Sequence, residues 1–526
     1  MFFYRGYPRY ATLIISCLIF LGSIGILFST KPRILILEDG LEDHEVNYSD
    51  DIPVLAPISR NNPNFPGIYV AEAFRVKNDT IRFVFLQHRE NQKQLEAKVQ
   101  GTDWNLVKAF CYNKTCDDIL FCDIATRIAI LRIDPTLEKV DNMSLAVVGN
   151  SEYFNIKVRD VRIKKENVYP HRVGVCLQPI FFYSDWPLII QFFESWLAQG
   201  ATKFYFYLHS YTKQTKLVLD FYKQKLGDNL EFVDWSDLPV HNRNRGDYNE
   251  DPNSRVFRHA ATAFMHDCML RARSHVKYVA NFDLDDFPFA ENGDIGETLD
   301  EIMLHQPIAG QVVVEWLLAK QTSMDWDSIN RPIDVPLSLS DVKLFSNSSV
   351  RWDYRVSNKI FHRPERVVVF DMHTVYRNER LPLNRKRRFE TAFALKTTKI
   401  FCLHLRRFER HIRETHNVFD RKFDYSLLEG LSEKMERNFK IRTSNSVFGN
   451  KTLAPWAMEA REIMRNLEQC RREAFGKELT GSNKMCQQSS SGCLGMLMSG
   501  TEFEHVPISW QDVAHTAIFN NYLESN

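Results

Sequence analysis

From residue 171 to about residue 320, apolar runs of strand type alternate with amphipathic stretches of helical spacing. The run RVGVCLQPIF is followed by WPLIIQFFESWLAQG, in which Trp186, Ile189 and Phe193 recur on one helical face and Gly200 stands as a C-cap. The alternation continues through KFYFYLH, TKLVLDFYKQKLG, LEFVDW, SRVFRHAATAFMHDCMLRAR, KYVANFD, IGETLDEIMLHQ and GQVVVEWLLA. Strand–helix–strand units at this spacing predict an α/β fold whose Rossmann-like, mostly parallel sheet is flanked by helices. Ser254 is the predicted N-cap of the longest of these helices.

The residues before this region carry a different pattern. A chain of 526 residues is too long for one ordinary core, so two or more lobes are expected. Short β-type runs separated by turn residues follow one another: GIYVAEAFRV, TIRFVFLQHR, RIAILRI and LAVVGN. They predict a smaller β-rich N-terminal lobe over residues 67–168.

The N-terminus contains one apolar run without a charge, residues 11–28, which is long enough to span a membrane as a helix. Basic residues on its two sides nearly balance, and the positive-inside rule leans toward a cytosolic tail at residues 1–10. A cleaved signal peptide is the alternative, but the apolar run is long and no A-x-A site follows it. The sequence therefore predicts a single-pass type II membrane protein with a signal-anchor, an acidic stem at residues 29–66 and a large lumenal part.

Glycosylation sites and cysteines agree with a lumenal location. Asn-x-Ser/Thr sequons occur at Asn47, Asn78, Asn113, Asn142, Asn347 and Asn450. Nine of the ten cysteines follow the apolar run: Cys111, Cys116, Cys122, Cys176, Cys268, Cys402, Cys470, Cys486 and Cys493. Several are expected to form disulfides, and the odd number leaves at least one free or intermolecular. Paired C-x-x-C spacing is missing from the first three, which argues against structural zinc there.

The charges of the chain nearly cancel, with 67 Lys and Arg against 66 Asp and Glu. This balance gives no general electrostatic reason for binding nucleic acid. Hydrophobic residues at 44% and aromatic residues at 13% are typical of a folded globular protein.

The segment KYVANFDLDDFPF places Asp283, Asp285 and Asp286 directly after a buried strand. Carboxylates this close repel one another unless a cation or a proton lies among them, so the cluster is either a metal site or a solvated turn. Ligands of open α/β sheets bind at the carboxyl ends of strands, and in extended chain Asp283 and Asp285 would face the same way. Oxygen ligands favour Mg²⁺ or Mn²⁺, which would suit the diphosphate of a nucleotide sugar.

Several segments in order resemble glycosyltransferase family 92: HRVGVCLQPIF, FFESWLAQGATKFYFYLHS, VLDFY, EFVDW, HDCMLRAR and KYVANFDLDDFPF. The similarity begins near Val168 and continues through NKIFHRPERVVVFDMHTVY to FCLHLRRF, which is roughly half the chain. The resemblance implies a lumenal, single-pass enzyme with a GT-A fold, with galactosyltransferases among the characterised members. It implies a catalytic domain at residues 169–440. The residues themselves predict a helical region at 441–484, from the amphipathic stretch LAPWAMEAREIMRNLEQCRREAF, and a loose tail at 485–526, where QQSSSGCLGMLMSG is low in complexity.

The resemblance also implies a metal site. Asp283 and Asp285 match the family's D-x-D motif, and His404 matches a late histidine that often completes the metal shell in GT-A enzymes. His373 is the alternative third ligand, and either histidine could instead be a hydrogen-bonded core residue. The expected cofactor is Mn²⁺ or Mg²⁺, held by Asp283, Asp285 and His404.

Residues at the strand ends are candidates for binding the nucleotide-sugar donor. They are Gln178, Pro179, Asp234, Asp283, Arg255 and Arg258. The two arginines lie about a turn apart on the predicted helix and could contact diphosphate oxygens, or else pair with Glu250 and Asp251. Catalysis with inversion needs a carboxylate base, for which Glu315 and Asp371 are both candidates.

These features predict a metal-dependent hexosyltransferase of the Golgi, or ER–Golgi, membrane. The expected reaction moves galactose from UDP-galactose to a glycan of a glycoprotein or glycolipid. In this chain Asp286 stands where the family has Glu, and Leu405 stands where it has Tyr. These departures leave room for an inactive GT-A-fold protein that binds glycans. A lumenal hydrolase of nucleotide diphosphates is a third hypothesis.

Overall fold

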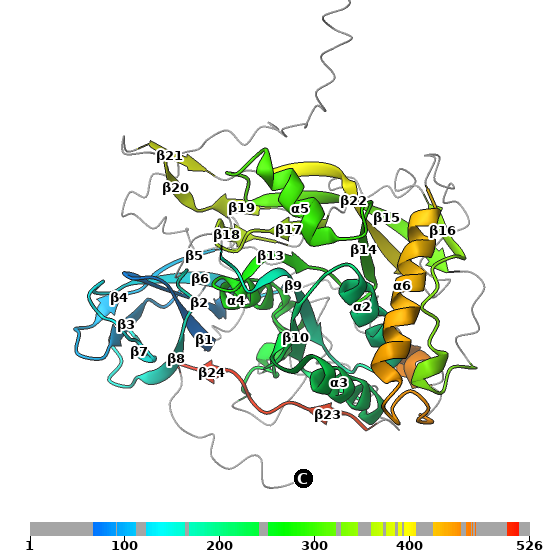
Figure 1. The fold of residues 1–526 in the computed structure, drawn as a ribbon. Helices are drawn as coiled ribbons and strands as arrows, with labels where there is room; N and C mark the ends of the chain where they lie inside the picture. Colours follow the sequence, from blue (N-terminus) through cyan, green and yellow to red (C-terminus); the bar gives the residue numbers. More distant parts are fainter. Residues whose placement is uncertain are drawn as a thin grey trace, which may run out of the picture. The chain divides into compact units, whose positions relative to one another are not determined.

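The computed structural model of the protein describes residues 67–90, 92–111, 122–163, 168–240, 251–321, 328–345, 359–371, 375–383, 388–391, 394–406, 424–453, 459–463, 465–466, 469 and 502–514. The predicted cytosolic tail, membrane anchor and stem lie outside these residues. Among the helices that are described, none is long and apolar enough to cross a membrane. The protein is a mixed α/β structure with two large sheets (Figure 1).

The first sheet is built from the β-type runs near the start of the described chain. Its strands are β1 Ile68–Lys77, β2 Thr80–His88, β3 Leu95–Val99, β4 Asn105–Leu106, β5 Lys108–Cys111, β6 Ile124–Arg132, β7 Asn142–Val147 and β8 Phe154–Asp160. They lie in the order β4-β3-β7-β8-β1-β2-β6-β5, and strand β24 (Gln511–Asp512) from the C-terminal segment also pairs with β1. All of these pairs are antiparallel except β1 with β8.

The second sheet contains the strands of the alternating region. They are β9 His171–Ile180, β10 Lys203–Leu208, β12 Leu230–Asp234, β13 Val276–Asn281, β14 Asp286–Ala290, β15 Gln311–Gln321, β16 Val342–Phe345, β17 Lys359–His362 and β22 Ala394–Arg406. The order is β12-β10-β9-β13-β17-β15-β22-β14, with β16 on β15. The first four strands are parallel neighbours. Beyond β13 only β15 and β22 pair in parallel, so the sheet is mixed, and the predicted mostly parallel sheet describes only its first half.

Helices cover both faces of this second sheet. They are α2 Trp186–Ala198, α3 Lys213–Leu226, α4 Ala261–Ala272, α5 Ile295–Leu304 and α6 Ser426–Thr443, with 3-10 turns η2 Gly227–Asn229, η3 Pro252–Ser254, η4 Phe257–His259 and η6 Pro332–Asp334. Helices α2, α3, α5 and α6 share one hydrophobic core with the sheet. Helix α4 packs on the other face and also contacts β1, β2 and β6, so it lies between the two sheets (Figure 1).

Helix boundaries follow the local signals in two places. The Asp185 side chain accepts a hydrogen bond from the N–H of Leu188 and caps α2, and Gly200 follows the helix with φ +88°. Gly227, with φ +56°, caps α3 at the last residue of the predicted helical run TKLVLDFYKQKLG. The third boundary was predicted wrongly, because α4 begins at Ala261 and not after Ser254. Arg258, His259 and Ala260 have positive φ and interrupt the helix.

The remaining pairings are short. Strand β11 (Ser210–Tyr211) pairs with β23 (Glu504–His505), β18 (Val367–Phe370) with β19 (Val375–Asn378), and β20 (Arg380–Leu383) with β21 (Arg388–Thr391). Strand β24 pairs with β1 of the first large sheet, and β23 forms a two-stranded sheet with β11, so part of the region predicted as a loose tail, residues 485–526, is paired with earlier strands.

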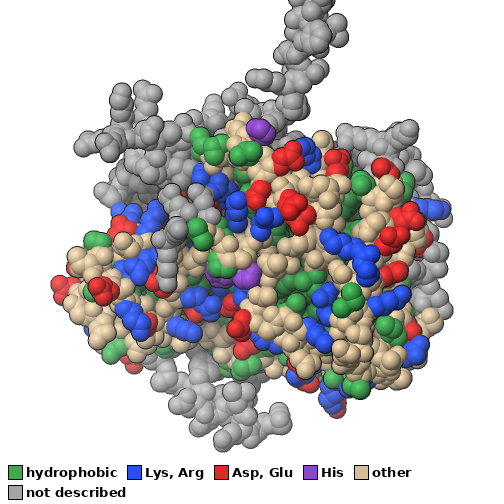
Figure 2. Space-filling model, viewed as in Figure 1, with side chains coloured by type: hydrophobic (Ala, Val, Ile, Leu, Met, Phe, Trp, Pro, Cys, Tyr) green, Lys and Arg blue, Asp and Glu red, His purple; other side chains and the backbone are tan. Residues whose placement is uncertain are grey.

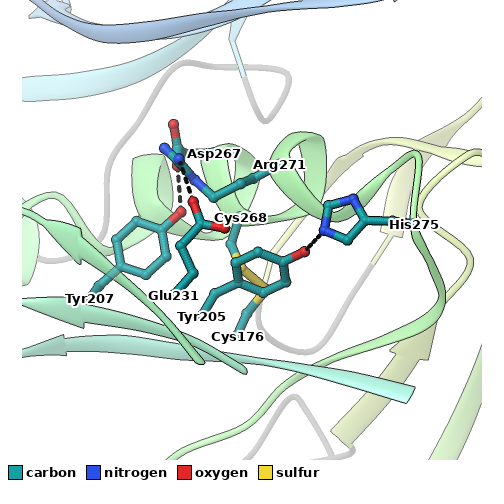
Figure 3. Close-up of a disulfide and its surroundings, with 8 residues drawn as sticks. All are labelled: Cys176, Tyr205, Tyr207, Glu231, Asp267, Cys268, Arg271 and His275. Atoms are coloured by element: carbon teal, nitrogen blue, oxygen red, sulfur yellow. Dashed lines mark hydrogen bonds and ion pairs between the residues drawn. A yellow bond between two sulfur atoms is a disulfide. The ribbon is translucent and has the colours of Figure 1, made fainter. Parts of the chain in front are cut away.

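One disulfide joins β9 to α4 through Cys176 and Cys268 (Figure 3). Around it, Tyr207 donates a hydrogen bond to Asp267, and Arg271 pairs with both Asp267 and Glu231 (Figure 3). The prediction of disulfides is thereby confirmed. Cys111 and Cys122 are also disulfide-bonded, and Cys402 is a buried free thiol. The other predicted cysteines lie outside the described residues.

The described surface carries both signs of charge. On the face drawn in Figure 2, basic and acidic side chains are intermixed. The sequons at Asn78, Asn142 and Asn450 are exposed, as glycosylation requires. Asn47, Asn113 and Asn347 lie outside the described residues.

Candidate active site

Three aspartates follow the carboxyl end of β13. Because β13 ends at Asn281 and β14 begins at Asp286, Asp283 and Asp285 occupy the connection between the two strands. The N–H of Asp286 donates to the carbonyl oxygen of Asp283 at 3.1 Å, so the chain turns here. Asp283 and Asp285 therefore do not lie in extended chain, and the prediction that they share one face of it is wrong. A turn, instead, brings the carboxylates together.

A buried lysine lies beneath this turn. The Nζ atom of Lys359, on β17, lies 2.8 Å from Oδ2 of Asp283 and 2.6 Å from Oδ2 of Asp286. Burial alone would raise the pKa of Asp286, but the Lys359 charge and the His404 hydrogen bond hold that pKa well below its ordinary value. Burial would lower the pKa of Lys359, but Asp283 and Asp286 raise it. The lysine is thus the cation that the crowding of like charges requires.

His404 faces the same turn from β22. The register of β14 and β22 sets Asp286 opposite His404. Their side chains meet at 2.8 Å between His404 Nδ1 and Asp286 Oδ1, so Nδ1–H donates to the carboxylate. The other ring nitrogen, Nε2, is buried, has no hydrogen-bond partner within the described residues, and lies 3.6 Å from Oδ2 of Asp285. The imidazole is therefore oriented by Asp286 and directs Nε2 toward Asp285.

This arrangement fits a divalent metal ion. The Oδ2 of Asp285 and the Nε2 of His404 are close enough to be ligands of one ion, and mixed oxygen and nitrogen donors suit Mn²⁺. Both oxygens of Asp286 are engaged, one by His404 and the other by Lys359 and the N–H of Asp283. Asp286 would thus support the histidine ligand rather than bind the ion, as carboxylates commonly do behind metal-bound histidines.

Three residues of this site were not predicted from the sequence. Lys359 is the first, and its position directly before the apolar residues Ile360 and Phe361 was the available signal, since buried lysines are almost always paired. Trp316, on β15, packs its ring 4.5 Å from that of His404 and donates from Nε1 to Asp286 at 3.3 Å. Asn281 is buried, and neither polar atom of its side chain has a hydrogen-bond partner among the described residues.

Three predicted donor-binding residues lie on strands whose carboxyl ends reach the same edge of the sheet. Gln178 and Pro179 are near the end of β9, and Asp234 is the exposed last residue of β12. Because β12, β10, β9 and β13 run in parallel, these residues end on the side where Asp283 lies. Their binding roles stay predictions.

The two predicted arginines are placed differently. The Arg255 side chain is fully buried and pairs with Asp123 at 3.2 Å, in the segment leading into β6. This ion pair engages the guanidinium within the protein, and the contact of Arg255 with a diphosphate stays a prediction. Arg258 is partly exposed and lies over the ring of Phe257, and its role stays a prediction.

The candidate bases are described only in part. The backbone of Glu315 lies in β15, next to an irregularity in the pairing with β22 between Val314 and Glu315. The carboxylate of Asp371 accepts a hydrogen bond from the Tyr376 hydroxyl at 2.6 Å. His373, the alternative metal ligand, lies outside the described residues.

A mixed α/β sheet with an acidic turn at the carboxyl end of one strand is typical of α/β enzymes that bind their ligands at strand ends. The family model of glycosyltransferase family 92 matches residues 171–452, which is more than half of the chain. The chain belongs to this family and is therefore a glycosyltransferase by membership, which implies a nucleotide-sugar donor and a glycan acceptor.

The other comparisons add no argument. No curated protein matches the chain. One solved structure that is matched, an amylomaltase from Corynebacterium glutamicum, has 16% sequence identity and a TM-score of 0.13. The match covers 28% of this chain and 21% of that chain. A score this low establishes no shared fold.

Proposed function

We propose that this glycosyltransferase is a metal-dependent hexosyltransferase of GT-A type, using UDP-galactose as donor. The acceptor would be a glycan on a glycoprotein or glycolipid in the Golgi lumen, with the chain anchored as a type II membrane protein. The observation that carries the metal dependence is the buried Nε2 of His404, which faces the Asp285 carboxylate without a hydrogen-bond partner among the described residues. The donor, the acceptor and the location rest on the family resemblance and the sequence.

Asp285 and His404 would hold Mn²⁺ or Mg²⁺, and Asp283 could offer the carboxylate oxygen that Lys359 does not engage. When bound, the ion would neutralise charge on the departing diphosphate. The protein's own residues prepare this place. Lys359 compensates the acidic turn, and Asp286 fixes the histidine ring.

In the transfer itself, the acceptor hydroxyl oxygen forms a bond to the anomeric carbon of the sugar. The bond from that carbon to the diphosphate breaks, and UDP leaves with the electron pair. In an inverting reaction, the hydroxyl proton passes to a carboxylate base, for which Glu315 and Asp371 remain the candidates. Asn281 would offer its amide to the donor at the end of β13.

The experiment uses the full chain in detergent, incubated with Mn²⁺, a panel of UDP-hexoses and a mixed glycan pool. UDP release and the mass of the glycans are recorded together. We expect one hexose to be added from a single donor, with loss of activity in EDTA and in Asp285→Asn. Asp334→Asn removes an exposed acid on η6 and should behave as wild type. Transfer that survives both EDTA and Asp285→Asn would rule out the metal mechanism.

One observation favours a second candidate, a glycan-binding protein without turnover. Lys359 already engages an oxygen of Asp283, the first residue of the D-x-D motif. If this pair persists when the donor binds, Asp283 offers one oxygen only. Glycan binding without UDP release from the folded chain would favour this candidate, whereas a hydrolase of nucleotide diphosphates would release sugar phosphate or phosphate without extending any glycan.

A further inference from the structure

A second cluster of possible metal ligands lies apart from the acidic turn. His209 directly follows β10, Asp237 follows β12, and His259 ends the 3-10 turn before α4. One ligand atom from each lies within 4.8 Å of the others. The two histidine side chains are buried, at 1% and 5% exposure, and the Asp237 side chain is 19% exposed. Nothing in the proposed transfer reaction uses these residues.

The fold brings the three side chains together from separate elements. Strands β10 and β12 are parallel neighbours with Leu208 opposite Asp234, so the residues that follow them leave the sheet together. His259 lies between two other residues of positive φ, a conformation that is strained for residues other than glycine. The indole N–H of Trp235 donates to the carbonyl oxygen of His259 at 2.8 Å and helps to hold this turn.

The distances within the cluster are close to those of a bound ion. His259 Nδ1 lies 3.4 Å from Oδ1 of Asp237, and His209 Nε2 lies 2.8 Å from the same oxygen. Ligand atoms about 2.0–2.1 Å from a tetrahedral zinc ion are about 3.3–3.4 Å apart. The first distance already matches, and the second requires the His209 ring to move by about half an ångström.

The hydrogen bond behind His209 also suits metal binding. Its Nδ1 lies 2.9 Å from the Oγ of Ser210, which is fully buried. As the side chains lie, Nε2–H donates to Asp237 at 2.8 Å, and Nδ1 accepts from the Ser210 hydroxyl. A bound ion would replace the Nε2 proton, and in the resulting tautomer Nδ1–H would donate to Ser210 while Nε2 offers its lone pair to the ion. A histidine ligand held through its second nitrogen is the usual arrangement at zinc sites.

We propose that His209, Asp237 and His259 form a second metal site, which binds a divalent transition-metal ion of the zinc class. Two imidazole nitrogens and one carboxylate oxygen favour Zn²⁺ over Mg²⁺ or Ca²⁺, which prefer oxygen ligands alone. Three protein ligands leave a fourth position open to water. The ion would join the end of β10, the segment after β12 and the turn before α4.

The test is direct metal binding by the full-length chain in detergent, with Asp285→Asn as background to weaken the first site. Zn²⁺ affinity is measured by competition with a chromophoric chelator, and Co²⁺ is added to record its visible spectrum. We expect one equivalent of Zn²⁺ and intense Co²⁺ bands of a low-coordinate site. Ser210→Ala should weaken Zn²⁺ binding by about 10–100-fold, and His209→Ala or His259→Ala by more than that.

His305→Ala is the matched control, because His305 is exposed after α5 and belongs to neither cluster. Circular dichroism verifies that each variant is folded. The proposal is overturned if the folded background chain takes up no Zn²⁺ at micromolar concentration. It is equally overturned if folded His259→Ala binds Zn²⁺ as tightly as the background chain. Since the readout is metal binding, its failure would leave the transferase proposal untouched.

Discussion

The Nζ atom of Lys359 lies 2.6 Å from Oδ2 of Asp286, and both side chains are almost fully buried. This pair explains why a chain can place three aspartates after an apolar strand. The charge of the lysine is shared with Asp283, and the histidine that faces Asp285 is oriented by the same Asp286. The ion pair therefore holds together the side chains that form the candidate active site.

Removing the lysine charge should destabilise the protein strongly. Lys359→Met keeps the length of the side chain but leaves Asp286 buried without its cation. Breaking a buried ion pair in this way costs about 3–5 kcal/mol. Lys343→Met, on the exposed face of β16, should change the unfolding free energy by no more than about 0.5 kcal/mol. Denaturant unfolding measures both, and equal effects would show that the pair contributes nothing specific.

Asp286→Asn should weaken metal binding without removing a ligand. The substitution replaces the carboxylate that accepts Nδ1–H of His404 with a weaker acceptor. A loss of about 10–100-fold in Mn²⁺ affinity is expected for such a change behind a ligand. The Mn²⁺ affinity is measured by titrating the full chain with Mn²⁺ and recording the electron paramagnetic resonance signal of the free ion. Asp334→Asn is the control. An unchanged Mn²⁺ affinity would show that Asp286 does not support the metal ligand.

Glu379 should give the protein a pH-dependent contribution to stability. It lies 2.6 Å from Arg82 on β2, 3.2 Å from Lys77 and 3.8 Å from Arg273. Burial alone would raise the pKa of Glu379, but Arg82 and Arg273 lower it to about 2. In the unfolded chain the pKa of a glutamate is about 4.3. The ion pairs of Glu379 therefore contribute about 3 kcal/mol to the unfolding free energy, and this contribution is fully present above about pH 4.3. It is lost as the pH falls toward 2.

The measurement compares the unfolding free energy of wild type and Glu379→Gln between pH 2 and pH 7. We expect the difference to be largest near neutral pH and to vanish near pH 2. Glu429→Gln, an exposed position on α6, should follow the wild-type profile. A difference that does not change with pH would contradict the proposed ion pairing.

The Cys176–Cys268 disulfide should stabilise the protein mainly through its covalent cross-link and less through the packing of its sulfur atoms. Cys176 and Cys268 are 92 residues apart in the sequence, so their bond restricts a long loop of the unfolded chain. Replacing both by Ala should cost about 2–5 kcal/mol. Cys402→Ala removes a buried thiol that forms no cross-link and should cost less. Calorimetry of the three proteins tests this, and equal losses would mean that the cross-link itself contributes little.

The parts of this fold that could be predicted depend on local signals. Each of these signals involves only residues that are close together in the sequence. They are the apolar run of β9, the helical spacing of α2, and the glycines that follow α2 and α3. The position of Asp283 and Asp285 after a strand also follows from the local pattern. Sequence periodicity was therefore enough to place one part of the site at the end of β13.

What could not be predicted depends on partners far away in the chain. The helix predicted from Ser254 is interrupted near His259, whose carbonyl is held by Trp235. Arg255 finds Asp123 in a segment that precedes β6. Lys359 reaches the acidic turn only because β17 pairs with β13, and no local pattern encodes that pairing. The donor assignment rests on the family resemblance, because no local pattern distinguishes one nucleotide sugar from another.

Gly200→Ala should be more damaging than an ordinary glycine substitution. A Cβ at Gly200 would collide with the carboxylate of Asp294, whose Oδ1 accepts the N–H of Glu297 at 2.8 Å and caps α5. The φ of +88° adds the strain of a left-handed conformation. We expect the collision and the strain together to lower the unfolding free energy by about 2–3 kcal/mol. Gly101 has a similar φ of +79°, but a methyl group added there would meet nothing within 4 Å, so Gly101→Ala measures the strain alone. Unfolding in urea compares the two variants, and equal losses would show that the contact with Asp294 has no energetic consequence.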